Sequence, residues 1–124
     1  MKEILFVFVG GGLGSVFRYS TSLLFPTTAN SFPYPTLLAN LVGCLLLGII
    51  LGASTKLQWH HESSMIFFTV GFCGGLTTFS TLVQESYDMA NTGAFLSFLL
   101  YTSLSFIGGL FLVFLGSQIP KLIS

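Results

Sequence analysis

The order of apolar and polar positions along this 124-residue chain predicts four membrane-spanning helices. Crossing the hydrocarbon core of a bilayer takes about 20 mostly apolar residues. The stretches that reach this length cover residues 4–25, 36–54, 64–89 and 95–119. Prolines separate the first two stretches, and Pro35 suits the first turn of the second helix. The fourth is expected to end before Pro120. We therefore predict a single all-α membrane domain over residues 1–124.

Composition supports a membrane protein, because 52% of the residues are apolar, 6% are charged and the mean hydropathy is +0.88. Soluble domains carry roughly 25% charged residues. Zero net charge without a basic cluster argues against a nucleic-acid partner. Cys44 and Cys73 fall in apolar segments, as small buried hydrophobic residues do. His60 and His61 are too few for a metal site and indicate a solvated turn, whereas Trp59 suits the membrane interface.

The placement of charge predicts an orientation. An even number of crossings brings both termini to one side, together with every lysine of the chain: Lys2, Lys56 and Lys121. The opposite loops, 26–35 and 90–93, contain no lysine or arginine. Only Arg18, near the far end of the first helix, could count towards that side. Because basic residues favour the cytoplasmic side, we expect cytoplasmic N and C termini.

The third apolar stretch contains an unusual segment at residues 71–81, with three glycines and four hydroxyl residues. Glycine costs about 1 kcal/mol relative to alanine inside a helix. Serine and threonine side chains also compete for backbone hydrogen bonds. Freed backbone groups at membrane depth must be buried in protein or reached by water. The segment is therefore either a tight helix-packing seam or a break that presents polar groups to an ion.

Five polar residues within the predicted spans each allow two interpretations. Arg18 either extends to the interface or serves a function. Asn40 either bonds a neighbouring helix or donates to an anion. Glu85 is either a solvated carboxylate near the membrane edge, which the sequence favours, or a gatekeeper of an ion path. Tyr101 and Ser105 share a helix face, where hydroxyls bond their own backbone or hydrate a passing ion.

The sequence argues against an enzyme. No serine has a plausible histidine and aspartate partner, and the glycine run at residues 10–14 lacks the strand–turn–helix context of a dinucleotide site. Small residues in the first, second and fourth helices instead permit close helix approach. Four short helices enclose little interior on their own, so we expect an oligomer.

Three motifs occur in order along the chain: Gly10-Gly11-Gly12-Leu13-Gly14-Ser15 leading to Arg18-Tyr19, then Thr36-Leu37-Leu38-Ala39-Asn40-Leu41-Val42-Gly43, then residues 71–81 followed by Glu85. Together they resemble the Fluc/CrcB family of small fluoride channels over essentially the whole chain. The resemblance implies a dimer of subunits inserted in opposite orientations, with the third helix broken at its middle. It also implies a structural sodium ion on the dimer axis, held by the backbone carbonyls of Gly74 and Thr77.

The resemblance further implies fluoride pores lined from both subunits. The residues that match the pathway are Asn40, Phe79, Ser80, Thr81, Tyr101 and Ser105, with Arg18 and Glu85 near its mouths. The chemistry is plausible, because a strongly hydrated anion needs donors to replace its water, and amides and hydroxyls donate. Aromatic ring edges carry the positive end of the ring quadrupole. Conduction also requires several weak sites rather than one deep trap.

The chain departs from the family pattern at Leu82, where a second phenylalanine is usual, and at Gly109 and Val113, where a polar track would continue. We interpret these positions as a partly lost pore lining. The lysine bias suits a subunit of fixed orientation, paired with a paralogue in a heterodimer; alternatively, Leu82 replaces the aromatic ring and a homodimer works. A non-transporting scaffold subunit is a further alternative. A small multidrug transporter would need an acidic residue within the first helix, which has none beyond Glu3.

Overall fold

The computed structural model describes residues 1–28, 30–58 and 62–123. Trp59, His60 and His61, with their predicted interface and turn roles, lie outside these ranges. Every regular element within the described ranges is a helix. The elements are α1 (Lys2–Leu24), α2 (Tyr34–Leu57), α3 (Glu62–Ile66), η1 (Phe67–Cys73), α4 (Gly74–Leu76), α5 (Phe79–Asn91) and α6 (Phe95–Leu122).

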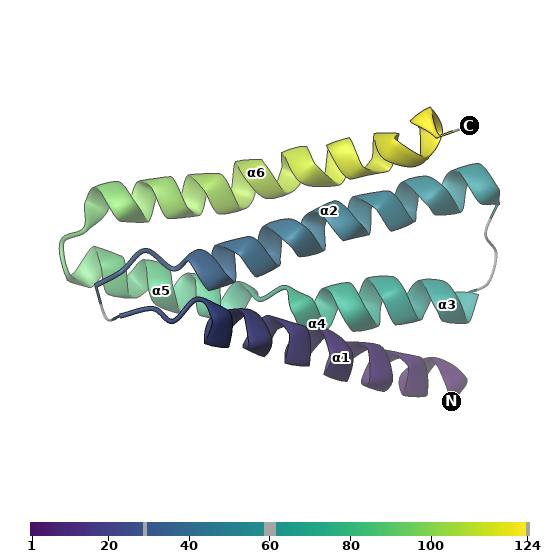
Figure 1. The fold of residues 1–124 in the computed structure, drawn as a ribbon, viewed down its shortest axis with the longest axis horizontal. Coiled ribbons are helices and arrows are strands. Elements are labelled where there is room, and N and C mark those ends of the chain that lie inside the picture. Colours follow the sequence, from purple (N-terminus) through teal and green to yellow (C-terminus); the bar gives the residue numbers. More distant parts are fainter. Residues whose placement is uncertain (29, 59–61, 124) are drawn as a thin grey trace.

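Four helical segments are long and apolar enough to cross a membrane: Lys2–Leu24, Tyr34–Leu57, Ser63–Asn91 and Phe95–Leu122. The third combines most of α3 with η1, α4 and α5. Both termini lie at the same end of the bundle, as an even number of crossings requires (Figure 1). The all-α membrane fold predicted from the apolar pattern is therefore confirmed.

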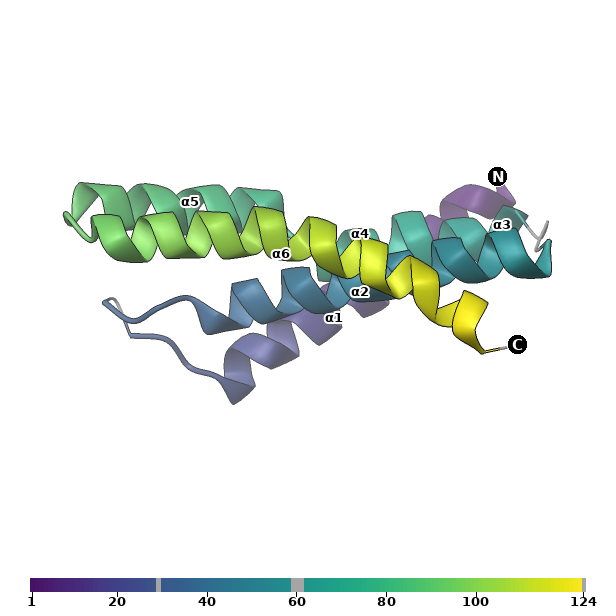
Figure 2. The same ribbon diagram turned by 90° about the horizontal axis from the view of Figure 1, so that it is seen from above.

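The helix ends show where tertiary contacts override local sequence. Pro35 lies in the first turn of α2, as predicted. The fourth helix, however, continues through Pro120 to Leu122 instead of ending before the proline. Lys56 Nζ donates to the carbonyl oxygens of Pro120 at 2.6 Å and Ile123 at 2.5 Å. These bonds satisfy carbonyls that a helix end leaves free. The last turns of α6 bend away from its axis (Figure 2).

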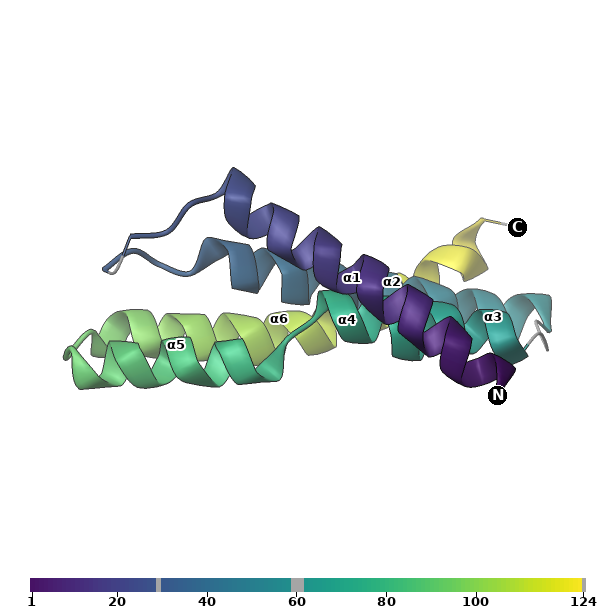
Figure 3. The same ribbon diagram turned by 90° about the horizontal axis from the view of Figure 1, so that it is seen from below.

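Glycines set the spacing between neighbouring helices. A Cβ added at Gly14 on α1 would lie 2.2 Å from the carbonyl oxygen of Phe72 on η1. A Cβ added at Gly48 on α2 would lie 2.3 Å from the carbonyl oxygen of Val113 on α6. Backbones this close require small residues, the usual basis of helix association in membranes. Figure 3 shows α1 crossing the third span at α4, and Figure 1 shows α6 beside α2.

The third span changes its helical form twice before it breaks. Residues Phe67–Cys73 form the π-helix η1, and Gly74–Leu76 return to an α-helix. Thr77 and Thr78 then adopt extended conformations, with ψ of 154° and 121°. The helix resumes at Phe79. The glycine-rich segment thus contains both a close-packed contact, where Gly75 meets Gly11 of α1, and a break two residues later at Thr77.

Candidate ion site at the break in the third span

Asn40 holds the break in place. Its Nδ2 donates to the carbonyl oxygen of Thr78 at 3.1 Å, and its Oδ1 accepts from the Thr78 amide at 2.7 Å. Asn40 is buried on α2, one turn and a half into the helix. Its side-chain amide therefore pairs with both backbone groups of Thr78 at membrane depth, where unpaired backbone groups are costly. Of its two predicted roles, bonding a neighbouring helix is the one seen within this chain.

The break leaves two carbonyl groups without the amides that would bond them in a continuous helix. In a continuous helix the Thr78 amide would donate to Gly74, but here it donates to Asn40. The Thr81 amide would similarly reach Thr77, but it donates to Thr78 Oγ1 at 3.4 Å. The carbonyls of Gly74 and Thr77 thus lose their helical donors. Backbone carbonyls at the ends of broken helices coordinate sodium in membrane proteins, so the donor chemistry of Gly74 in α4 and of the extended Thr77 fits the predicted ion.

Arg18 is anchored to the third span. Its Nε donates to the carbonyl oxygen of Gly75 at 3.1 Å, and the residue is half-buried. It lines a cavity of about 320 Å³ together with hydroxyls from α1, α2 and α5 and with Glu85. A charge within a spanning helix is stabilised when it pairs with protein carbonyls or faces a hydrated cavity. The position of Arg18 meets both conditions and differs from simple extension to the interface.

Glu85 is bound by hydroxyls from two other helices. Thr36 Oγ1 donates to Oε1 at 2.8 Å, and the Tyr101 hydroxyl donates to Oε2 at 2.5 Å. Tyr101 is fully buried, and the ring of Phe32 meets it edge-to-face at 5.7 Å. The favoured expectation of a solvated carboxylate is therefore wrong, because Glu85 is half-buried and both its oxygens accept protein hydrogen bonds. Hydrogen bonds to a charged group contribute about 1.5–3 kcal/mol each.

A second cavity, of about 610 Å³, lies on another side of the break. Asn40, Phe79, Leu82 and Ser105 all contribute to its lining. The Ser105 hydroxyl is buried, and among the described residues it has no hydrogen-bond partner. Phe79 is 78% exposed in the single chain. The structure thus places two predicted pathway residues, Asn40 and Phe79, in the same cavity as the unsatisfied Ser105 hydroxyl.

The remaining predicted residues lie elsewhere. Ser80 and Thr81 cluster around Thr78 Oγ1, at 3.4 and 3.1 Å. Tyr101 faces Glu85 and does not line the cavity that holds Ser105. Of the three positions interpreted as lost pore lining, Leu82 lines the larger cavity, whereas Gly109 and Val113 lie in the contact between α2 and α6. A Cβ added at Gly109 would be 3.2 Å from Cys44 Sγ. The backbone of Val113 packs directly against Gly48.

The sequence prediction left out two residues that shape the site, Thr36 and Thr78. Thr36 precedes Asn40 by four residues, and this spacing puts both on one face of α2. That signal was available in the sequence. Thr78 could not be singled out among neighbouring hydroxyl residues, because its role depends on its backbone pairing with Asn40. Both cysteines, Cys44 and Cys73, are free in the described structure and line the larger cavity.

These features define a small multi-pass membrane protein whose third spanning helix is broken and held open by a buried asparagine. Residues 5–117 match the family model described as CrcB-like protein, Camphor Resistance (CrcB), and the chain belongs to this family. It is 42% identical over 117 residues, 94% of either chain, to a protein of Azobacteroides pseudotrichonymphae named fluoride-specific ion channel FluC. Proteins of the same name match at 39% in Bacteroides fragilis, over 98% of either chain, and at 38% in Chlorobaculum tepidum, over 98% of this chain and 97% of the relative. The family is one of ion channels, which confirms the expectation that the chain is not an enzyme.

Proposed function

We propose that this chain is a subunit of a fluoride channel that lets fluoride leave the cytoplasm by passive electrodiffusion across a bacterial cell membrane. The name shared by its relatives supports the ion. The observation that carries the proposal is the buried Ser105 hydroxyl, unpartnered in the described structure, in the cavity beside Asn40 and Phe79. A buried donor without a partner calls for an explanation, and a dehydrated anion passing it supplies one.

The two cavities suggest how fluoride crosses. At one, Arg18 and hydroxyls raise the local anion concentration without forming a deep trap, since the guanidinium is already engaged by Gly75. In the other cavity the hydration water of fluoride is replaced in turn by three groups: the Ser105 hydroxyl, the edge of the Phe79 ring and the second N–H of Asn40. Each contact is weak on its own, which allows the ion to leave as well as to enter.

A second copy in the opposite orientation would complete the site. A two-fold axis through the break would bring together the carbonyls of Gly74 and Thr77 from both subunits. Two oxygens from each subunit would then face one another. These four oxygens would hold the structural sodium, which supplies a fixed positive charge at the dimer centre. The exposed Phe79 would be covered by the partner. The three lysines favour an orientation with cytoplasmic termini.

Fluoride efflux from liposomes that contain only this purified chain tests the proposal. We expect rapid fluoride loss, no chloride loss, and at least a tenfold lower rate in Ser105→Ala. If the chain alone carries no fluoride but does so with a paralogous subunit, the heterodimer suggested by Leu82 is established. Partner binding without any flux would identify a scaffold subunit, and the channel assignment for this chain would fall.

A further inference from the structure

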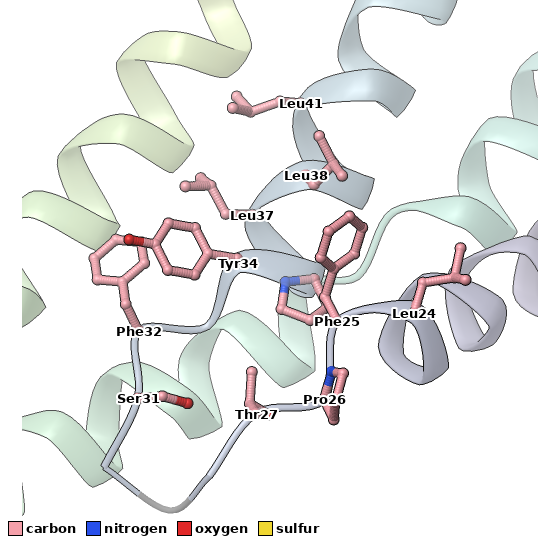
Figure 4. A pocket seen from close by; sticks show the side chains of 11 residues that line it. Leu24, Phe25, Pro26, Thr27, Ser31, Phe32, Tyr34, Leu37, Leu38 and Leu41 are labelled. Carbon is pink, nitrogen blue, oxygen red and sulfur yellow. The ribbon is translucent and has the colours of Figure 1, made fainter.

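An apolar pocket of about 560 Å³ lies where the linker meets α1 and α2, and it adjoins the Arg18 cavity through the shared residues Thr27 and Pro35. We call it the linker pocket. Its walls include Leu24 and Phe25 from the end of α1, Tyr34 from the start of α2, and Leu38 and Leu41 further along α2 (Figure 4). Four of these five side chains are 43–74% exposed: Leu24, Phe25, Tyr34 and Leu38. The pocket is therefore open to its surroundings.

The pocket extends along α2, which is the direction an acyl chain takes in a bilayer. From Tyr34 to Leu41 the helix rises by roughly 10 Å, so the pocket reaches from the end of the span into the hydrocarbon region. Thr27 and Ser31, which belong to the linker, lie at the end of the pocket opposite Leu41, as Figure 4 shows. One end of the linker pocket is thus apolar at membrane depth, and the other carries hydroxyls at the level of lipid headgroups.

The polar end is continuous with acidic side chains. Thr27 and Ser31 also line a smaller cavity of about 200 Å³, together with Glu85 and Asp88. The linker has no lysine or arginine. Within the described ranges the single ion pair joins the N-terminal amine to Glu3, at the far end of the bundle. Asp88 therefore forms no ion pair with a described residue. A negative charge therefore lies at the headgroup end of an apolar pocket without a basic partner.

We propose that the linker pocket binds one acyl chain of phosphatidylethanolamine, with the lipid's ammonium group beside Asp88. The ammonium of this zwitterionic headgroup complements the acidic end of the pocket in charge, and it offers three N–H donors, as a lysine does. The quaternary ammonium of phosphatidylcholine has the same charge but no N–H donor. The proposal therefore distinguishes two lipids whose acyl chains can be identical.

Lipid titration of the detergent-purified full chain, followed by native mass spectrometry, tests this assignment. We expect dioleoyl phosphatidylethanolamine to bind about fivefold more tightly than dioleoyl phosphatidylcholine, the net effect of one hydrogen bond that the quaternary ammonium cannot donate. Asp88→Asn should remove the difference. Glu3→Gln, a matched change at the other end of the bundle, should preserve it. Leu38→Trp, which fills the pocket, should weaken both lipids.

Equal affinities for the two lipids, or an unchanged preference in Asp88→Asn, would overturn the proposal. Absence of any bound lipid from the dimer would also overturn it and would indicate that a second copy covers the pocket. Circular dichroism and the elution volume of each variant establish that the fold is retained. Because binding is the readout, the outcome is independent of whether the chain conducts fluoride.

Discussion

Asn40 binds both backbone groups of Thr78, through hydrogen bonds of 3.1 and 2.7 Å. The side-chain oxygen takes the place of the Gly74 carbonyl, which would accept from the Thr78 amide in a continuous helix. One residue of α2 thereby pairs with the break in the third span and draws the Thr78 amide away from the Gly74 carbonyl. The connection ties the stability of the chain to the geometry of the proposed ion site.

Asn40→Ala should therefore destabilise the protein and abolish fluoride flux. Two hydrogen bonds are lost and buried backbone groups are left unpaired, at a cost of about 1–3 kcal/mol for each unsatisfied group. Thermal unfolding in detergent and liposome efflux measure the two effects. Asn91→Ala, an exposed asparagine at the end of α5, is the matched control and should change neither. A melting temperature for Asn40→Ala equal to that of the control would refute this role.

Tyr101→Phe removes one of the two hydroxyls that bind Glu85. Because that carboxylate is half-buried, we expect a loss of about 1.5–3 kcal/mol, the range for hydrogen bonds to charged groups. A double-mutant cycle with Thr36→Val measures how far the two hydroxyls act together. Tyr87→Phe alters a tyrosine that is 65% exposed on the same side of the break and should be neutral. Equal effects of the two tyrosine variants would contradict the prediction.

Gly14→Ala should disrupt the packing of α1 on η1, since the added Cβ would lie 2.2 Å from the Phe72 carbonyl oxygen. Overpacking of this kind costs about 1–3 kcal/mol. Gly12→Ala, two residues away, meets nothing within 4 Å and should be stabilising by up to about 1 kcal/mol through helix propensity. The two alanine variants should thus shift the unfolding midpoint in opposite directions. A shift of the unfolding midpoint in the same direction for both variants would show that the contact between α1 and η1 is not close-packed.

Sodium should raise the melting temperature of the dimer above its value in potassium at equal ionic strength. An ion that binds the folded state and not the unfolded one stabilises in proportion to the logarithm of its concentration. The gain should disappear in Asn40→Ala, because the Thr78 amide would then be free to pair with the Gly74 carbonyl. Identical melting curves in the two salts would argue against a sodium site.

Leu82→Phe tests whether the pore lining is deficient. Leu82 lines the 610 Å³ cavity, which has room for a larger side chain. We expect the variant to fold normally and to raise the fluoride efflux rate several-fold. Val83→Phe places the same ring on the neighbouring, 47% exposed position and should leave the rate unchanged. An unaltered rate in Leu82→Phe would favour the view that leucine already serves in place of the ring.

The sequence predicted the spans well because crossing a bilayer imposes length and apolarity on each segment separately. Local composition likewise marked the weak point of the third span. It could not assign the partners of Arg18 and Glu85, since those hydrogen bonds join residues up to 57 positions apart. The fourth helix illustrates the same limit. Pro120 is a helix-ending signal in isolation, and only the distant Lys56 accounts for the continued turn.

The π-helix Phe67–Cys73 has a consequence for how the chain tolerates changes in length. A π-turn contains one more residue than the α-turn it replaces, so the helix on either side keeps its direction and facing. A single-residue deletion within η1 could therefore be absorbed by a return to α-helical form, with the break at Thr77 and Thr78 undisturbed. The same deletion in α1 would rotate Gly14 away from Phe72. Insertions and deletions among related chains should accordingly concentrate in this segment rather than in the helices that it joins.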